Sequence, residues 1–126
     1  IDYFDELNFK LAKEAIDCYK IIRGDIAKSY AVYPTGMALI GERSFVTAGL
    51  IDEKRTQMYL AVWKADALTD ETVIDLSKYC GCDSSVKMIY PENDGKCEYV
   101  YSKALKKLTV KLSGTKYMAR MFKIEL

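Results

Sequence analysis

This chain of 126 residues contains no histidine, which removes the commonest general base and the commonest zinc ligand from its chemistry. It also lacks a charge imbalance, because its net charge of +1 comes from acids and bases that are interspersed. Such a balance is not typical of a nucleic-acid-binding protein or of a membrane-surface protein. No apolar run approaches the roughly 20 residues of a membrane-spanning helix. We therefore expect no nucleic-acid partner and no membrane partner.

The sequence also lacks an initiator methionine and any familiar catalytic motif. Its first residue, Ile1, already lies in a helical pattern, so we expect a fragment excised from a longer polypeptide. No G-x-S-x-G, P-loop or G-x-G-x-x-G motif is present. The paired acids Asp52-Glu53, Asp70-Glu71 and Glu92-Asp94 fall on predicted turns, where carboxylates are normally solvated. The sequence therefore predicts no catalytic residue and no cofactor site.

Half of the residues are apolar, and a chain of this length can bury roughly two-thirds of its unfolded surface, which is enough for one domain. The most apolar stretch, Met58–Lys64, predicts a strand at the centre of a sheet, because both of its faces are apolar. Its residues would alternate between the two sides, with Met58, Leu60 and Val62 on one and Tyr59, Ala61 and Trp63 on the other. Trp63, the only tryptophan, is predicted to lie in the core.

The first part of the chain predicts one long helix, from Asp2 to about Ser29. Apolar residues recur there at three- and four-residue spacing and form a stripe over nearly half of the circumference. Such a helix would be about 40 Å long, which is more than a small β domain can cover. We therefore expect Phe4, Leu7 and Leu11 to be exposed, or covered by a missing domain or a second copy. The alternative is a terminal helix that packs fully on its own domain.

From residue 34 onward the apolar period changes to two, which is typical of strands. The expected strands are Met37–Ile40, Ser44–Ile51, Met58–Lys64, Thr72–Leu76, Ser85–Tyr90, Cys97–Tyr101, Leu108–Leu112 and Tyr117–Leu126. The segments on either side of Pro91–Gly95 are predicted to form a hairpin. In the last strand the apolar face switches at Met121–Phe122, which predicts a bulge or a strand that crosses between sheets.

Regularly spaced strands joined by turns are typical of an antiparallel sandwich. The predicted fold is therefore mainly β, an antiparallel β-sandwich of about eight strands of Greek-key type, preceded by one long N-terminal α-helix. The expected division places the helix in residues 1–33 and the sandwich in residues 34–126.

Four cysteines raise the questions of a metal site and of a disulfide. Cys80, Cys82 and Cys97 supply three thiols, but a structural zinc site needs four ligands, usually in C-x2-C pairs, and Cys18 lies on the distant helix. We therefore predict no metal site. A disulfide from Cys97 to Cys80 or Cys82 would form only in an oxidising compartment. We expect reduced thiols and a cytoplasmic protein.

Ten tyrosines and one tryptophan allow a carbohydrate-binding role, because sugar rings stack on exposed aromatic faces. Tyr90, Tyr99 and Tyr101 share the predicted hairpin and could form such a platform. Aromatic residues are equally typical of strands, where they are partly buried. Exposure of the rings distinguishes the two, because a binding module presents a row of exposed rings and an accessory domain hides them.

Three stretches occur in a fixed order, namely Tyr19-Lys-Ile-Ile-Arg-Gly-Asp-Ile26, Tyr59-Leu-Ala-Val-Trp-Lys64 and Ala119-Arg-Met-Phe-Lys-Ile124. Together they resemble the C-terminal end of glycoside hydrolase family 36 α-galactosidases (melibiases). The first is similar to the family's closing barrel helix, the second to the strand that opens its C-terminal sheet domain, and the third to its terminal strand. The match runs from about Glu14 to the end of the chain and departs from the family around Cys80–Cys82.

The resemblance implies a longer enzyme with an N-terminal β domain, a (β/α)8 catalytic barrel and this sandwich at its C-terminal end. In that family two Asp residues of the barrel act as nucleophile and acid/base, and neither lies in these 126 residues. The helix would be the last helix of the missing barrel. The expected function is a non-catalytic accessory domain that stabilises the barrel and its assembly, with that barrel as partner and a homo-oligomer as a further option. A carbohydrate-binding module and an unrelated protein-interaction sandwich remain as alternatives.

Overall fold

The structure is a computed structural model that describes residues 6–36, 44–91, 96–114 and 117–126. Within these residues it has one helix and eight strands in two antiparallel sheets, so the predicted mainly β fold with an N-terminal helix is confirmed. The elements are α1 (Glu6–Ile26), β1 (Ser29–Val32), β2 (Ser44–Asp52), β3 (Gln57–Ala65), β4 (Glu71–Asp75), β5 (Ser85–Tyr90), β6 (Cys97–Ser102), β7 (Lys107–Leu112) and β8 (Tyr117–Glu125). The helix is not long and apolar enough to cross a membrane.

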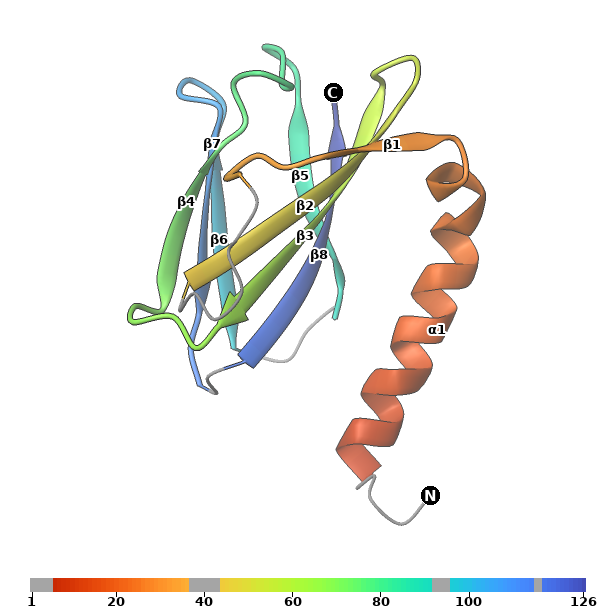
Figure 1. Cartoon of the computed structure of the whole chain (residues 1–126), viewed down its shortest axis with the longest axis vertical. Coiled ribbons are helices and arrows are strands. Elements are labelled where there is room, and N and C mark those ends of the chain that lie inside the picture. The colour runs from red at the N-terminus through yellow and green to blue at the C-terminus, as the bar shows by residue number, and fades with distance from the viewer. Residues whose placement is uncertain (1–5, 37–43, 92–95, 115–116) are drawn as a thin grey trace.

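The larger sheet has the strand order β1-β2-β3-β8-β5 and the smaller one the order β4-β7-β6. Along the described chain, consecutive strands change sheets four times, which is the interleaved connectivity of a Greek-key type sandwich. The strand β3 lies at the centre of the larger sheet, between β2 and β8, as its two apolar faces predict. The helix α1 lies on the side of the larger sheet, away from β4, β6 and β7 (Figure 1).

The core fills the space between the two sheets. It is built from alternate residues of facing strands, including the fully buried Met58, Leu60, Val62, Leu108, Val110, Leu112, Phe122 and Ile124. Phe122 of β8 meets Tyr99 of β6 edge to face, with the ring centroids 5.2 Å apart. Because these two rings come from different sheets, their contact helps to hold the sandwich together.

The helix ends earlier than the sequence predicts, at Ile26 and not at about Ser29. The next residues, Ser29–Val32, form the edge strand β1, which pairs with residues 49–52 of β2. The Ser29 hydroxyl donates to the Asp25 carbonyl at 2.7 Å and satisfies a carbonyl of the last helical turn. The helix therefore gives way to the sheet at residues 27–28, before the expected boundary near residue 34. The strand expected at Met37–Ile40 lies outside the described residues.

Two further expectations are wrong. The strands β5 and β6 do not form a hairpin, because β5 pairs with β8 in the larger sheet and β6 pairs with β7 in the smaller one. The strand β8 keeps one alternation through Met121–Phe122, with no register shift against β3, because the buried Arg120 occupies an inward position. The irregularity lies in the neighbouring strand β5, between Met88 and Tyr90.

Candidate functional site

The outer faces of the two sheets differ in chemistry. On the three-stranded sheet, exposed charges of opposite sign lie directly across from each other, as in the pairs Glu71–Lys111, Glu98–Lys111 and Asp75–Lys107. Such pairs are typical of a solvated sheet surface. On the five-stranded sheet most outward positions of β2, β3 and β8 are apolar, namely Val46, Ala48, Leu50, Ala61, Trp63, Ala65, Ala119 and Met121, whereas Lys87 of β5 and Lys123 of β8 are charged. An apolar face of this kind is normally covered.

The helix α1 covers only one end of this apolar face. Near the end of the helix, the Asp25 carboxylate accepts a hydrogen bond from the Tyr59 hydroxyl of β3 at 2.7 Å. About four turns earlier, the Leu11 carbonyl accepts one from the Tyr90 hydroxyl of β5 at 3.0 Å. Between them lies Ile22, the helix residue that is buried against the sheet. These contacts hold α1 over the end of β3 that contains Tyr59, and no described helix covers the end that contains Trp63.

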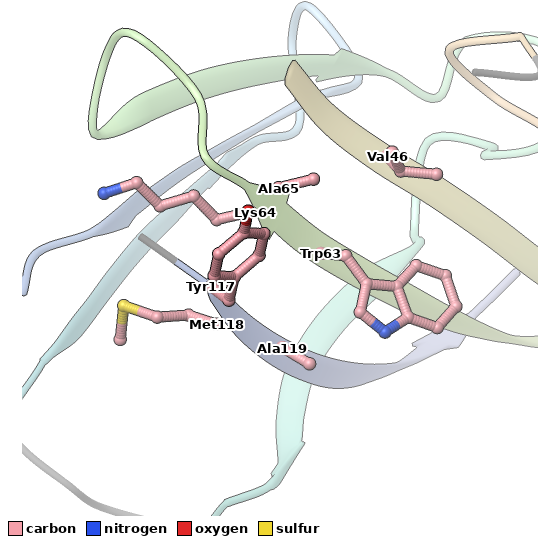
Figure 2. A pocket seen from close by; sticks show the side chains of 7 residues that line it. All are labelled: Val46, Trp63, Lys64, Ala65, Tyr117, Met118 and Ala119. Carbon is pink, nitrogen blue, oxygen red and sulfur yellow. The ribbon is translucent and has the colours of Figure 1, made fainter. Parts of the chain in front are cut away.

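The uncovered end of the sheet and the adjoining flank of α1 form a hollow surface, which we call the concave face. A groove of about 310 Å³ lies between α1 and strands β1 to β3, and its lining includes Ile22, Ile26, Tyr33, Ala48, Ala61 and Trp63. A shallow depression of about 490 Å³ continues from Trp63 over β3 and β8, where Val46, Ala65, Tyr117 and Ala119 line it (Figure 2). Trp63 belongs to both hollows, so they form one continuous apolar surface.

Three aromatic side chains of the concave face are exposed. Trp63 is 42% exposed and Tyr117 is 71% exposed, and Tyr33 is exposed as well. The prediction that Trp63 lies in the core is therefore wrong. An apolar strand face indicates burial only where something covers it, and α1 does not reach Trp63. Its neighbours across β2 and β8, Val46 and Ala119, are too small to cover the indole.

The opposite flank of α1 is charged. The groove of about 320 Å³ on this side is lined by Glu14 and Asp17 of the helix and by Lys87 and Lys123, which face each other on β5 and β8. Cys18 also lies here, and burial, with a smaller contribution from Glu14, raises the pKa of its thiol, so it stays protonated at neutral pH. Ile21, Met88 and Ile89 also line this groove, so this flank combines charged and apolar side chains, whereas the described residues that line the groove between α1 and strands β1 to β3 are all uncharged.

Exposed apolar residues of α1 extend the concave face along the helix. Ile26 lines the apolar groove, and Tyr19 lies on the same side because seven residues make about two helical turns. Ile16 and Phe9 continue this exposed line toward the start of the helix. The expectation of an incompletely covered helix is confirmed for Leu7, which is 59% exposed. It is wrong for Leu11, which is half-buried beside Tyr90, and Phe4 lies outside the described residues.

The bond between Tyr59 and Asp25 predicts how pH acts on the position of α1. The hydrogen bond from the Tyr59 hydroxyl holds the pKa of the Asp25 carboxyl below its ordinary value, and a hydrogen bond from the Gln57 side chain makes a smaller contribution. Burial raises the pKa of Tyr59, and the hydrogen-bonded Asp25 carboxylate raises it further. The pKa of Asp25 is lower in the folded chain than in the unfolded chain, where it is about 3.9. The ionised carboxylate therefore stabilises the fold fully at pH values above about 3.9, and this stabilisation is lost as the pH falls through the folded-state pKa.

We therefore expect Tyr59→Phe to return the pKa of Asp25 toward its ordinary value and to weaken the pH dependence of the free energy of unfolding below about pH 5. NMR titration of the Asp25 carboxyl carbon measures the first effect, and urea unfolding at several pH values measures the second. Tyr19→Phe is the matched control, because Tyr19 is an exposed tyrosine of α1. An Asp25 titration that is the same in Tyr59→Phe and in the unsubstituted chain would show that this bond does not perturb Asp25.

The predicted cysteine cluster does not assemble into a site. None of the four cysteines is in a disulfide: Cys80 is buried, Cys97 and Cys18 are half-buried and Cys82 is exposed. Burial raises the pKa of Tyr101, and the adjacent Cys80 makes a smaller contribution in the same direction. The Tyr101 hydroxyl is therefore neutral at physiological pH. Among the residues that the structure describes, no three His, Cys, Asp or Glu side chains are grouped so that they could hold a metal ion. That the protein binds no metal stays a prediction.

The three tyrosines of the expected hairpin do not form a platform. Tyr90 points toward α1, whereas Tyr99 and Tyr101 of β6 pack against the core of the sandwich. The Tyr99 hydroxyl accepts a hydrogen bond from the Met88 amide at 3.3 Å. The row of exposed rings lies instead on the concave face. Its sequence signal is the apolar character of the outward positions in three neighbouring strands, β2, β3 and β8.

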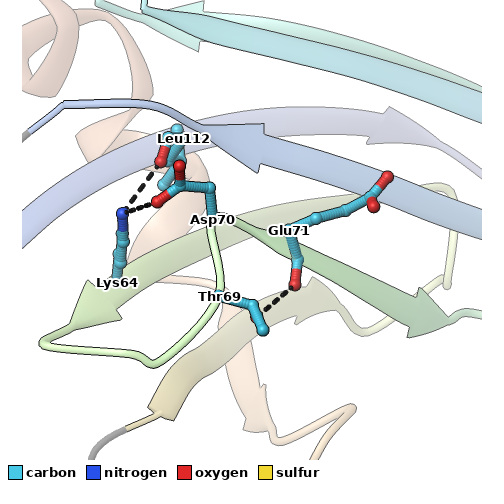
Figure 3. A network of polar contacts seen from close by, with 5 residues as sticks. All are labelled: Lys64, Thr69, Asp70, Glu71 and Leu112. Atoms are coloured by element: carbon cyan, nitrogen blue, oxygen red, sulfur yellow. Dashed lines mark hydrogen bonds and ion pairs between the residues drawn. The ribbon is translucent and has the colours of Figure 1, made fainter.

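Two of the acids expected on turns, Asp52 and Asp70, have structural partners. The Asp52 carboxylate accepts hydrogen bonds from the Thr56 hydroxyl and amide and from the Gln57 amide, and the Thr56 hydroxyl contributes most to holding the pKa of Asp52 below its ordinary value. Asp70 accepts from the Lys64 ammonium at 2.5 Å, and Lys64 also donates to the Leu112 carbonyl at 3.0 Å (Figure 3). Lys64 points inward from β3 and thus joins the two sheets. Glu92 and Asp94 lie outside the described residues.

Comparison with known proteins gives no match to a protein-family model, to a curated protein or to a solved structure. The concave face and the three stretches that resemble α-galactosidases therefore carry the functional conclusion.

Proposed function

We propose that this chain is a non-catalytic accessory domain that docks through its concave face onto a larger domain of the same polypeptide. The observation that supports this proposal is the contrast between the apolar outer face of β2, β3 and β8 and the outer face of the other sheet, where cross-strand charge pairs flank the exposed Val73 and Val100. Contiguous exposed apolar surface bordered by charged residues is typical of an interaction site. The turn acids Asp52 and Asp70 have structural roles, because Asp52 accepts hydrogen bonds within its own turn and Asp70 forms an ion pair with Lys64.

The resemblance supplies an identity for the larger domain. It would be the catalytic barrel of an α-galactosidase-type glycoside hydrolase, and α1 would be the last helix of that barrel. The exposed side of α1 with Phe9, Ile16 and Tyr19 would then pack against neighbouring barrel elements. In this proposal the sandwich stabilises the barrel and its assembly, and the enzyme is cytoplasmic.

Activity measurements test the proposal. We expect the 126-residue chain not to hydrolyse a chromogenic α-galactoside, and the full-length product of its gene to hydrolyse it with retention of anomeric configuration. Retaining hydrolysis needs two carboxyl groups about 5 Å apart beside the bound sugar, and in the resembling family both belong to the barrel. Turnover by the 126-residue chain would contradict a non-catalytic role. A full-length product without glycosidase activity would contradict the α-galactosidase assignment.

One observation favours carbohydrate binding as a second candidate function, namely the exposed rings of Tyr33, Trp63 and Tyr117 on one surface. Sugar hydroxyls need hydrogen-bonding partners in addition to stacking. The lining between these rings is mostly alanine and other aliphatic side chains, which favours docking of protein over sugar. Titration with galactose and melibiose, followed by Trp63 fluorescence, separates the two. Docking predicts no change, and a saturable change would support the sugar-binding role.

A further inference from the structure

We infer that the concave face is filled by a single amphipathic α-helix of the same polypeptide, which lies beside α1 on the five-stranded sheet. This inference rests on the proposed docking role and names the partner of that same surface. Three features of this surface support the inference: the width of the uncovered sheet, the size of its side chains and the area that remains exposed.

The uncovered end of the sheet has the width of one helix. The strand β1 pairs only with residues 49–52 and β5 pairs only with residues 121–125, so the end that contains Trp63 consists of β2, β3 and β8. Three strands at a spacing of about 4.8 Å span roughly 14 Å. An α-helix with its side chains is about 10–12 Å across. One helix therefore fits beside α1, and a second does not.

The side chains of the uncovered end favour a helix over an extended segment. The floor contains Ala48, Ala61, Ala65 and Ala119, which allow the backbone of an occupant to approach closely. The backbone groups of β3 are already paired with β2 on one side and β8 on the other, so an added strand would gain no ladder hydrogen bonds here. The same face already accepts one helix, because α1 buries Ile22 on it.

The exposed area indicates that the occupant is covalently attached. The uncovered part of β3, residues 61–65, is about 17 Å long, so the floor measures roughly 240 Å². With a comparable contribution from the flank of α1, the surface reaches about 500 Å². A stable interface between independent proteins buries about 800 Å² on each partner. A second copy would therefore bind weakly, whereas a linked helix benefits from an effective concentration in the millimolar range.

Fluorescence of Trp63, the only tryptophan, tests this inference on the 126-residue chain. The probe is an amphipathic Leu/Lys peptide of about 18 residues, which makes five helical turns. The control peptide has the same composition in an order without an apolar helical face. We expect the amphipathic peptide to shift the Trp63 emission to shorter wavelength, with a dissociation constant in the high micromolar to millimolar range because it is not linked. The control peptide should cause no shift.

Two matched variants locate the site. Ile16→Lys places a charge on the side of α1 that borders the concave face, and we expect it to weaken peptide binding at least tenfold. Ile21→Lys is the control, because Ile21 is 81% exposed on the charged flank of the same helix, and we expect unchanged binding. Circular dichroism of both variants verifies that the helix is retained.

Three results would overturn the inference. Equal responses to both peptides would show general stickiness, and no response at millimolar peptide would exclude a helix. A stable dimer of the 126-residue chain at micromolar concentration in sedimentation equilibrium would show that a second copy fills the surface. None of these results depends on the α-galactosidase activity of the full-length product, so the failure of this inference can be distinguished from the failure of the proposed function.

Discussion

Phe122→Ala is expected to lower the free energy of unfolding by about 3–5 kcal/mol, and Trp63→Ala by only about 1–2 kcal/mol. Phe122 is fully buried between the sheets and packs on Tyr99, so its removal leaves a cavity in the core. Trp63 is the larger side chain but is 42% exposed, so truncation removes only part of its contacts and opens no cavity.

Urea unfolding monitored by far-UV circular dichroism measures both changes, which avoids the use of Trp63 as the reporter. A loss for Trp63→Ala equal to or larger than that for Phe122→Ala would contradict the placement of Trp63 on the outer face. Because a domain of this size has a total stability of only about 5–15 kcal/mol, Phe122→Leu serves as a milder variant should Phe122→Ala fail to fold.

Asp70→Ala is expected to lower the free energy of unfolding by about 2–3 kcal/mol, which is more than the roughly 1 kcal/mol expected for Lys64→Met. The Lys64 side chain is only 4% exposed, so loss of Asp70 leaves a buried ammonium group that still donates to the Leu112 carbonyl but has lost its carboxylate. Methionine removes the charge and keeps the length of the side chain. It leaves the Leu112 carbonyl without this donor, whereas the Asp70 carboxylate, whose side chain is 53% exposed, can be solvated by water.

The double variant Lys64→Met/Asp70→Ala completes a thermodynamic cycle for this pair. We expect it to be more stable than Asp70→Ala alone, because no buried charge then lacks a carboxylate. Additive losses from the two single variants would show that Lys64 and Asp70 are energetically independent. That result would remove this ion pair from the contacts that join the two sheets.

The strands could largely be predicted from the sequence because their alternation is regular. The prediction of Met58–Lys64 as the central strand differs from the observed β3, Gln57–Ala65, by one residue at each end. Pairing could not be predicted in the same way. The period-two pattern of Ser85–Tyr90 shows that it is a strand, but its partner β8 is set by the loops that cross between the sheets. The edge strand β1 has four residues, too few to show a pattern.

The candidate site could be predicted only in part. Both apolar faces of β3 and the wide apolar stripe of the helix are visible in the sequence, and together they predict a surface that needs cover. The position of α1 could not be predicted, because it depends on contacts between distant residues such as Tyr59 with Asp25 and Tyr90 with Leu11. Without that position, Trp63 cannot be distinguished from the covered Tyr59, four residues away on the same face.

The central claim is that a longer polypeptide covers the concave face, and the effect of Trp63→Lys in two contexts tests it most directly. Thermal unfolding is measured for the 126-residue chain and for the full-length product of its gene, with Val100→Lys as the control on the exposed outer face of the other sheet. A buried lysine without a partner costs several kcal/mol, and 1 kcal/mol corresponds to about 2–4 °C in a protein of 150–250 residues. We predict that Trp63→Lys lowers the melting temperature by at least about 5 °C more in the full-length product than in the isolated chain, whereas Val100→Lys has the same small effect in both. Equal effects of Trp63→Lys in the two contexts would contradict the claim.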